Sequence, residues 1–478
     1  MRTDAPTPPR ERVAGSLPTG LSTARLTVLL TLTQSPLLLL WGAVPAAYQF
    51  GGVVATPLIF GLGGLALLCF AVAYGGMAGR MPAAGGLRVF VAKGLGAPIG
   101  LGAGVVALLS YVALMSAMLV YFGGWLTGLV AAVFGVRFPM WFVVLAGVIV
   151  IAGLGTLRLP SLLHVLIGFA AVQVIVVVAF DVLALANPPG GRVSVDALDP
   201  TWLFGGSFSV ALCFAVTSFI GPEVGVTFAD EVRSPRRTVP RAVLLSYGIV
   251  VALVVMSSWA MSTATGPLDA VPLARGHLEL LTAGDRQPFM SALATQLVGG
   301  GAARPVVDVM TVALITGAIA SVTTISQSVA RQVGGLARDG ILPTALPRPA
   351  RHCGLAAAGV VALVVGLQDD PATAALYLTL GAGLGVAGVL ALTALATAAW
   401  FLRNDDGDSG YVGWEGRVVA AGFAAVVLAY VVVYSTIRLP ELLPGDADLR
   451  DWVFPLFLGG GFTIGLVWSG ILSVRRGR

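Results

Sequence analysis

The chain has 478 residues, of which 57% are apolar and only 11% are charged, and its mean hydropathy is positive. This composition excludes an ordinary soluble globular protein and predicts a polytopic membrane protein. The three cysteines, Cys69, Cys213 and Cys353, show no pairing pattern and no metal-ligand spacing, so we expect free thiols, no metal and no cofactor.

Twelve apolar stretches are long enough to cross a bilayer, although the ninth is short. They cover roughly residues 25–50, 53–77, 100–126, 138–158, 160–186, 203–229, 241–265, 305–332, 353–368, 372–402, 412–436 and 452–474. We therefore predict an all-α integral membrane protein with about twelve transmembrane helices.

The basic residues are distributed unevenly between the two sides that these stretches define. Residues 1–24 are polar and Pro-rich, without the apolar core of a signal peptide, so we expect a cytoplasmic tail. With that end inside, only seven of the 28 basic residues fall outside: Arg137, Arg192, Arg275, Arg286, Arg304, Arg438 and Arg450. The positive-inside rule then places both termini, including residues 475–478, on the cytoplasmic side of the plasma membrane. The basic excess is a topology signal and gives little support to a nucleic-acid partner.

The first stretch is interrupted at Gln34-Ser35-Pro36. Ser35 before Pro36 resembles an N-cap followed by the first position of a new helix, which would free the N–H groups of Leu37 and Leu38 to face a ligand. The alternative is a simple proline kink, which membrane helices tolerate.

Polar residues in the third and fifth stretches leave two readings open. Tyr111 is either a core residue whose hydroxyl bonds to backbone or a substrate contact. In the fifth stretch, His164 and Gln173 either bridge helices or take part in ion coupling.

The sixth stretch is broken in its middle by Ser218-Phe219-Ile220-Gly221-Pro222-Glu223. Gly221 tolerates unusual dihedral angles and Pro222 favours the start of a helix, so a second half-helix should begin there. Non-helical backbone in a bilayer survives only where it lines a polar cavity, which implies a ligand. Glu223 is the only acid that we place deep in the membrane, and this makes it a functional candidate. The alternative is a proline kink with a buried, protonated glutamate.

Two further segments suggest gating or ion binding. After the sixth stretch, Arg236, Arg237 and Arg241 are expected to anchor the inner helix ends through Asp230 or Glu231, so we assign Arg237 a gating role. The eighth stretch is dense in hydroxyls that either coordinate a cation or bond back to their own helix, and we favour the second reading. These are Ser321, Thr323, Thr324, Ser326 and Ser328.

The interrupted stretches are the opening helices of two five-span units, residues 25–186 and 203–402. Because five is odd, the second unit enters the membrane from the opposite face, which is the pattern of an inverted repeat. Residues 187–202 form an outer loop between the units, and residues 403–474 add two helices. A long outer segment, residues 266–303, is expected to be partly helical and to cover the outer mouth.

Three motifs together resemble the amino acid-polyamine-organocation (APC) superfamily of transporters. The break at Ser218 to Glu223, followed by FADEVRSPRRTVPRA, is similar to that family's sixth span. MPAAGGLRVFVAKGLG resembles its linker after span two, and SVARQVGGLARDGILP resembles its exit from span eight. The resemblance implies two inverted five-helix repeats plus two extra helices, alternating access, and a substrate held between the breaks of spans one and six.

The resemblance also suggests which residues form the site. The expected substrate contacts are Gln34, Ser35, Pro36, Leu37, Leu38, Tyr111, Thr217, Ser218, Phe219, Ile220 and Gly221. The expected coupling and gating residues are Glu223, Gln173, His164 and Arg237. The lysine that some proton-coupled members carry in span five is missing here, and Gln173 and His164 are its nearest polar substitutes, so the coupling ion stays open.

We therefore predict a secondary active transporter that moves an amino acid or related amine, with proton coupling. An exchanger or uniporter without ion coupling is the alternative. A membrane enzyme is disfavoured because the three histidines, His164, His277 and His352, lack a paired helical spacing for haem or metal. An ATP-driven pump is disfavoured because Lys93 does not lie in a phosphate-binding loop. The expected partners are the small-molecule substrate, the lipid bilayer and protons, and the sequence leaves the oligomeric state unknown.

Overall fold

A computed structural model of the chain describes residues 20–81, 85–282, 288–342, 353–404, 413–442 and 450–476. Within these ranges the protein is all-helical and has no strand, so the predicted fold class is confirmed. Ten helices or interrupted helices are long and apolar enough to cross a membrane. The predicted fourth and ninth spans form shorter apolar helices, Met140–Thr156 and Cys353–Gly366, so the count of twelve stays a prediction.

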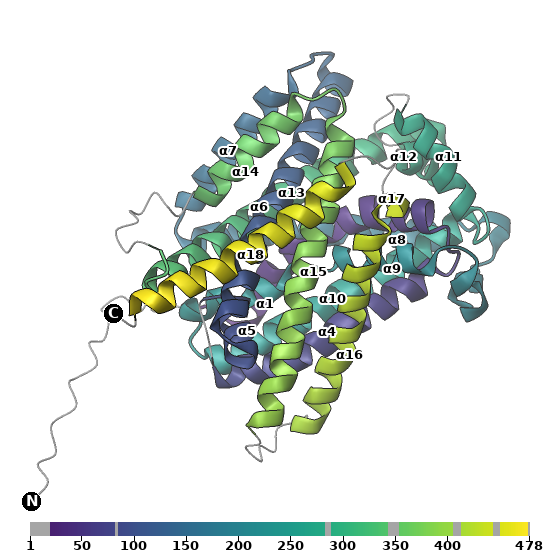
Figure 1. Cartoon of the computed structure of the whole chain (residues 1–478). Helices are drawn as coiled ribbons and strands as arrows, with labels where there is room; N and C mark the ends of the chain where they lie inside the picture. Colours follow the sequence, from purple (N-terminus) through teal and green to yellow (C-terminus); the bar gives the residue numbers. More distant parts are fainter. Residues whose placement is uncertain are drawn as a thin grey trace, which may run out of the picture.

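The helices follow the apolar stretches in chain order (Figure 1). The α-helices are α1 (Thr23–Gln34), α2 (Pro36–Leu38), α3 (Val44–Ala46), α4 (Thr56–Arg80), α5 (Leu87–Leu95), α6 (Ala97–Phe134), α7 (Met140–Thr156), α8 (Leu159–Ala186), α9 (Phe208–Ser218), α10 (Pro235–Thr265), α11 (Ala270–Thr282), α12 (Pro288–Val298), α13 (Gly300–Arg338), α14 (Cys353–Gly366), α15 (Pro371–Arg403), α16 (Trp414–Ile437), α17 (Leu439–Leu442) and α18 (Arg450–Arg476). Two π-helical turns, η1 (Leu39–Ala43) and η2 (Ala47–Gly51), and four 3₁₀ helices, η3 (Pro189–Gly191), η4 (Asp196–Leu198), η5 (Pro200–Phe204) and η6 (Pro222–Glu231), complete the order.

Two spans are interrupted where the sequence predicts. The first changes direction at Ser35, between α1 and α2. The sixth ends its α-helix at Ser218 and continues after Gly221. The continuation is a ten-residue 3₁₀ helix, η6, which begins at Pro222, so a second half-helix begins where the sequence predicts and is wound more tightly than an α-helix. Gly225 in η6 packs closely against Leu30 and Val243, because a Cβ at this position would lie 2.8 Å from a side-chain carbon of each. The tightly wound segment is therefore also tightly packed against its neighbours.

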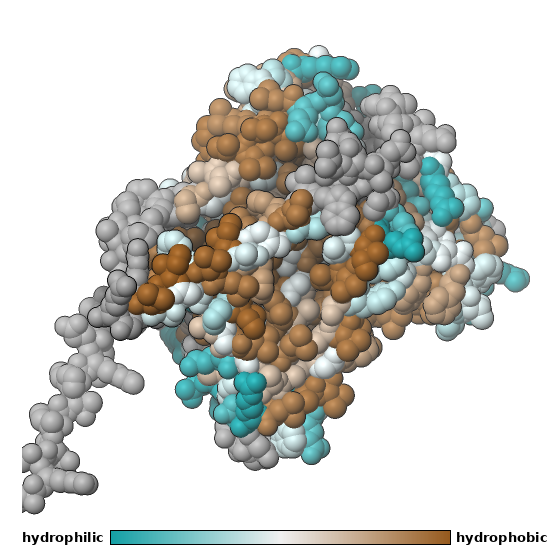
Figure 2. All heavy atoms as spheres, in the orientation of Figure 1, coloured by the Kyte–Doolittle hydropathy of each residue, from teal (hydrophilic) through white to brown (hydrophobic). Residues whose placement is uncertain are grey.

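The broken spans lie inside the helix bundle. In the first span and in the span formed by α9 and η6, most of the apolar window is buried, at 78% and 89%. By contrast, α8, α16 and α18 present many apolar side chains outward, including Val426 and Ile437. Figure 2 shows apolar residues gathered over the middle of the visible face, which is expected for a surface that lies against lipid.

Other helices surround this centre. α4 packs against α10, and α15 packs against α6 and α16. α7 and α14 lie side by side at one edge of the molecule (Figure 1). α11 and α12 contact each other, and they contact η2 and α13 respectively, so the segment between α10 and α13 is partly helical as predicted.

Candidate functional site

The break in the first span is set by the backbone of Ser35. Its φ of 49° lies in the left-handed region, which a residue with a side chain rarely adopts. Ser35 occupies the N-cap position before Pro36 as predicted, but its hydroxyl donates to Oε1 of Gln173 at 2.8 Å and makes no capping hydrogen bond. The N–H of Leu38 donates to the carbonyl of Ser35 at 2.8 Å, so it does not face a ligand in this structure.

The break in the sixth span depends on Gly221. Its φ is 147°, and a Cβ there would lie 2.4 Å from Oγ1 of Thr33, so no larger residue fits without movement. Beside it, the side-chain amide of Gln34 donates to the carbonyl of Phe219. The two breaks therefore contact each other directly, with one hydrogen bond satisfying a carbonyl at the end of α9.

Glu223 follows the second break and is fully buried. Its Oε1 accepts a hydrogen bond from the hydroxyl of Tyr111 at 2.8 Å. Its Oε2 accepts from the hydroxyl of Tyr247 at 2.9 Å and from the N–H of Gly221 at 2.7 Å. The hydroxyl of Tyr74 lies 3.5 Å from the carbonyl oxygen of Glu223. Three donors from three elements therefore converge on one carboxylate, and among the described residues no cation pairs with it.

Tyr111 is a buried residue, but its hydroxyl bonds to the acid of the sixth span and not to backbone. Its role as a substrate contact stays a prediction. Tyr74 and Tyr247 were missed by the sequence interpretation. The available signal was a tyrosine in the middle of an apolar stretch, because a buried hydroxyl needs a partner.

The other residues predicted around the breaks are close to them but are differently engaged. The hydroxyl of Thr217 donates to the carbonyls of Cys213 and Phe214, and that of Ser218 donates to Ala215, so both bond back to their own helix. Among the remaining predicted contacts, Leu38 is half-buried. The others are buried: Pro36, Leu37, Phe219 and Ile220.

The two polar residues of the fifth span have different surroundings. Gln173 is fully buried at the first break, next to Ser35. Its Nε2 and the Oε1 of Gln34 are buried and have no hydrogen-bond partner among the described residues. His164 is exposed, and its Nδ1 lies 2.7 Å from the carbonyl of Pro160 in its own helix. The structure therefore brings Gln173 to the site and leaves His164 away from it.

A second acid is buried in a membrane-spanning helix, so Glu223 is not the only one. Asp181 of α8 is 7% exposed, and its Oδ2 accepts a hydrogen bond from Ser257 of α10 at 3.0 Å. Its Oδ1 is buried without a hydrogen-bond partner in the part of the chain that the structure describes. The sequence interpretation overlooked Asp181 because it lies near the predicted outer end of its apolar stretch.

The hydroxyls of α13 behave largely as predicted. Thr323, Thr324 and Ser326 donate to carbonyls of their own helix. Ser321 and Ser328 are exceptions: Ser321 donates to the carbonyl of Thr33 at 2.7 Å and so connects α13 to the first break, and Ser328 accepts from the hydroxyl of Thr227 in η6 at 3.2 Å. The described residues contain no group of three His, Cys, Asp or Glu side chains that could hold a metal ion, and the three cysteines form no disulfide.

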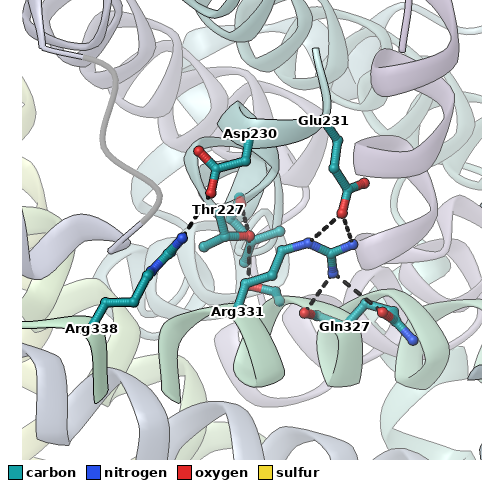
Figure 3. A network of polar contacts seen from close by, with 8 residues as sticks. Thr227, Asp230, Glu231, Gln327, Arg331 and Arg338 are labelled. Carbon is teal, nitrogen blue, oxygen red and sulfur yellow. Dashed lines mark hydrogen bonds and ion pairs between the residues drawn. The ribbon is translucent and has the colours of Figure 1, made fainter. Parts of the chain in front are cut away.

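Ion pairs connect the end of η6 to α13 on the side that the sequence predicts to be cytoplasmic, here called the inner side (Figure 3). Glu231 pairs with Arg331, and its Oε1 lies 3.0 Å from Nε of that arginine. Asp230 pairs with Arg338 at 3.1 Å. We expected these acids to pair with arginines of the same loop, but their partners come from the eighth span. Arg237 is exposed.

Two further contacts reinforce the inner side. Arg88 of α5 pairs with Asp339, directly after α13. Ahead of α1, the N–H of Leu21 donates to the carbonyl of Glu231 at 2.9 Å, and Leu21 forms a parallel bridge with Val232. The inner ends of spans one, six and eight and the linker helix α5 are therefore joined through a few polar contacts.

The comparisons with known proteins identify the family of the chain. A model of the family described as amino acid permease matches residues 22–446. This range includes both breaks, Glu223 and its three tyrosines, and the ion pairs of the inner side. A search of the curated proteins found no match. A permease is a transporter rather than an enzyme, which agrees with the all-helical, multi-pass architecture. The chain belongs to the amino acid permease family of the APC superfamily.

Proposed function

We propose that the protein is a secondary active transporter that moves an amino acid or related amine across the plasma membrane by alternating access, coupled to protons. The observation that carries this proposal is the direct contact of the two helix breaks next to a buried acid. At the breaks, Gln34 donates to the carbonyl of Phe219, and Glu223 receives three hydrogen bonds one residue beyond Pro222.

The substrate site lies between the breaks. When they separate, the carbonyl of Phe219 and the side-chain amide of Gln34 lose each other as partners. A carbonyl accepts a hydrogen bond from a substrate ammonium, and an amide N–H donates to a substrate carboxylate. The unpartnered Oε1 of Gln34 and Nε2 of Gln173 offer one further acceptor and one further donor. A zwitterion can therefore be held without a fixed charge from the protein.

Proton coupling is assigned to Glu223. The N–H of Gly221 can only donate to Oε2, so a proton on the carboxyl group points toward a tyrosine hydroxyl, either from Oε1 toward Tyr111 or from Oε2 toward Tyr247. That hydroxyl then has to accept instead of donate. Protonation thus reverses a hydrogen bond that connects α6 or α10 to the second break. A further titratable group in contact with Glu223 is Tyr74.

The orientation proposed is that of the sequence prediction, with both termini in the cytoplasm. It is supported by the basic residues on the inner side, including Arg88, Arg331 and Arg338. Gating at this side is proposed for the ion pairs of Arg331 and Arg338. Arg237, for which we predicted that role, is exposed and is assigned only a contribution to membrane orientation.

The test is uptake of a panel of labelled amino acids and polyamines into proteoliposomes, with an imposed proton gradient, an imposed sodium gradient or neither. We expect accumulation of at least one amino acid driven by an inward proton gradient, and none in protein-free liposomes. Uptake that needs substrate on the opposite side indicates an exchanger, and equilibration without any gradient indicates a uniporter. Failure to transport any member of the panel would contradict the proposal.

A further inference from the structure

A cavity lies between η6 and α13 on the inner side. It has a volume of about 340 Å³, which is at the lower end of the range of small-molecule sites. Its lining comes from η6 and α13: Thr227, Asp230, Glu231, Gln327, Arg331 and Arg338, with Ala330 and Gly334 between them. Figure 3 shows the charged side chains of both elements converging here.

The cavity is distinct from the site between the breaks. Thr227 is its lining residue nearest in sequence to Glu223, four residues further along η6. A 3₁₀ helix rises about 2.0 Å per residue, so the two residues are roughly 8 Å apart along its axis. The hydroxyl of Thr227 is 3.2 Å from that of Ser328, so a polar contact between η6 and α13 lies at this end of the cavity.

The lining has both signs of charge, two acids and two arginines, in equal number. Arg331 is held by several contacts, because it pairs with Glu231, donates to the carbonyl of Gln327 and lies 4.2 Å from the centre of the Phe228 ring. Arg338 is more loosely held, since its side chain is 61% exposed and only its Nη1 is bonded to Asp230. Arg331 is therefore held in place, whereas Arg338 has donor groups left that can bind a ligand.

One acid of the cavity has spare acceptor capacity. Both bonds from Arg331 go to Oε1 of Glu231, and Oε2 is buried with no hydrogen-bond partner among the described residues. A buried carboxylate oxygen without a donor is unfavourable. An ammonium group supplies three donors and a positive charge, and is the chemical group that best relieves this.

We propose that this cavity is a second binding site for a zwitterionic amino acid, with the ammonium at Glu231 and the carboxylate at Arg338. The inference rests on the proposed function, because it places the transported class of solute at a binding site between the breaks and the inner side. The ligand carboxylate takes the place of Asp230 at Arg338, and Asp230, whose side chain is 64% exposed, is then solvated by water. Binding would therefore loosen the connection between η6 and α13, which release to the inner side requires.

A cysteine reporter tests the site in detergent-solubilised full-length protein, in which sidedness does not matter. Gly334 lines the cavity, and a Cβ at this position meets no atom within 4 Å, so Gly334→Cys fits without displacement. The background lacks Cys69, Cys213 and Cys353. Gly413→Cys is the reference for reagent chemistry, because this glycine is also exposed, has equally open space and is outside the cavity.

The probe is glycine, the smallest zwitterion of the class, compared with methylamine and acetate, which each have one of its charges. We expect glycine to slow maleimide labelling of Gly334→Cys, by about tenfold at ten times its dissociation constant, and to leave Gly413→Cys unaffected. Methylamine or acetate at the same concentration should protect much less. Protection by acetate alone equal to that by glycine would overturn the proposal in favour of an anion site.

Two variants, Arg338→Gln and Gly221→Ala, distinguish this site from the breaks, and Arg236→Gln is the control. Arg338→Gln should abolish protection, and Arg236→Gln, which removes the same charge from an exposed residue outside the lining, should retain it. Gly221→Ala, which perturbs the breaks, should also retain it. Loss of protection with Gly221→Ala would show that glycine acts only through the first site. If uptake is observed but glycine never protects, the second site is wrong and the transporter proposal stands; if glycine protects but no solute is transported, the reverse holds.

Discussion

The backbone at Gly221 provides the sharpest test of the proposed substrate site. Replacing this glycine by alanine adds one methyl group at a φ of 147°, where residues with a side chain are strained by about 1–3 kcal/mol. The new carbon would also lie 2.4 Å from Oγ1 of Thr33 and 3.1 Å from Cγ of Gln34. Because Thr33 and Gln34 precede the first break, relief of this contact must separate the two breaks.

The expected consequence is loss of the hydrogen bond from Gln34 to Phe219, which is worth about 1 kcal/mol in addition to the strain. The total of about 2–4 kcal/mol is a loss of stability of the folded protein. Binding falls for a separate reason, because the added methyl group occupies the space between the breaks in which the substrate is proposed to lie. We therefore expect Gly221→Ala to purify as a folded protein with a lower melting temperature and with substrate binding and uptake near background.

The matched control is Gly248→Ala in α10, where a Cβ meets nothing within 4 Å. Both variants are measured by thermal unfolding of the purified protein, by calorimetric binding of the amino acid found in the uptake panel, and by counterflow. Gly248→Ala should match the parent in binding and counterflow, and its melting temperature should be equal to or slightly above that of the parent, because alanine favours a helix interior. If Gly221→Ala also binds and transports like the parent, the breaks do not form the site and the argument from their contact fails.

Three further changes test other parts of the structure. Glu223→Gln should retain binding and flatten the pH dependence of counterflow between about pH 5 and 8, because it removes the titratable carboxyl group while keeping its shape; an unchanged pH profile would refute the coupling role. Arg331→Ala should lower the melting temperature, since a hydrogen bond to a charged group contributes about 1.5–3 kcal/mol, whereas Arg237→Ala should leave it unchanged because that side chain is exposed. Asp181→Asn should raise the melting temperature, because the amide keeps a partner for Ser257 and removes a buried carboxylate that pairs with no cation among the described residues; a lower melting temperature would contradict this reasoning.

The sequence alone determined the membrane class, the positions of the apolar helices and the location of both breaks. These features depend on local chemistry. A run of apolar residues crosses the bilayer whatever its neighbours are, and Pro36 and Gly221 disturb the backbone at their own positions. The three motifs, at the second break, after span two and at the exit from span eight, also sufficed to recognise the APC superfamily, which the match over residues 22–446 confirms.

Which side chains surround Glu223 was decided by the tertiary structure. Tyr74, Tyr111 and Tyr247 come from three different helices, and nothing in the local sequence of any of them indicates that all approach Glu223. Helices that are apolar on all sides show little periodicity, so their sequence does not reveal which face meets which neighbour. For this reason Tyr74 and Tyr247 were missed and the surroundings of His164 were not foreseen.

The same reason explains the ion pairs of the inner side. By sequence distance, Asp230 and Glu231 are closest to Arg233, Arg236 and Arg237, and a local reading chooses partners among these. In the folded protein α13 passes beside η6 and brings Arg331 and Arg338 to the two acids, about 100 residues away in the chain. Where a helix breaks follows from its own residues, whereas the partner of a buried or half-buried polar group depends on which segments the packing of the bundle places side by side.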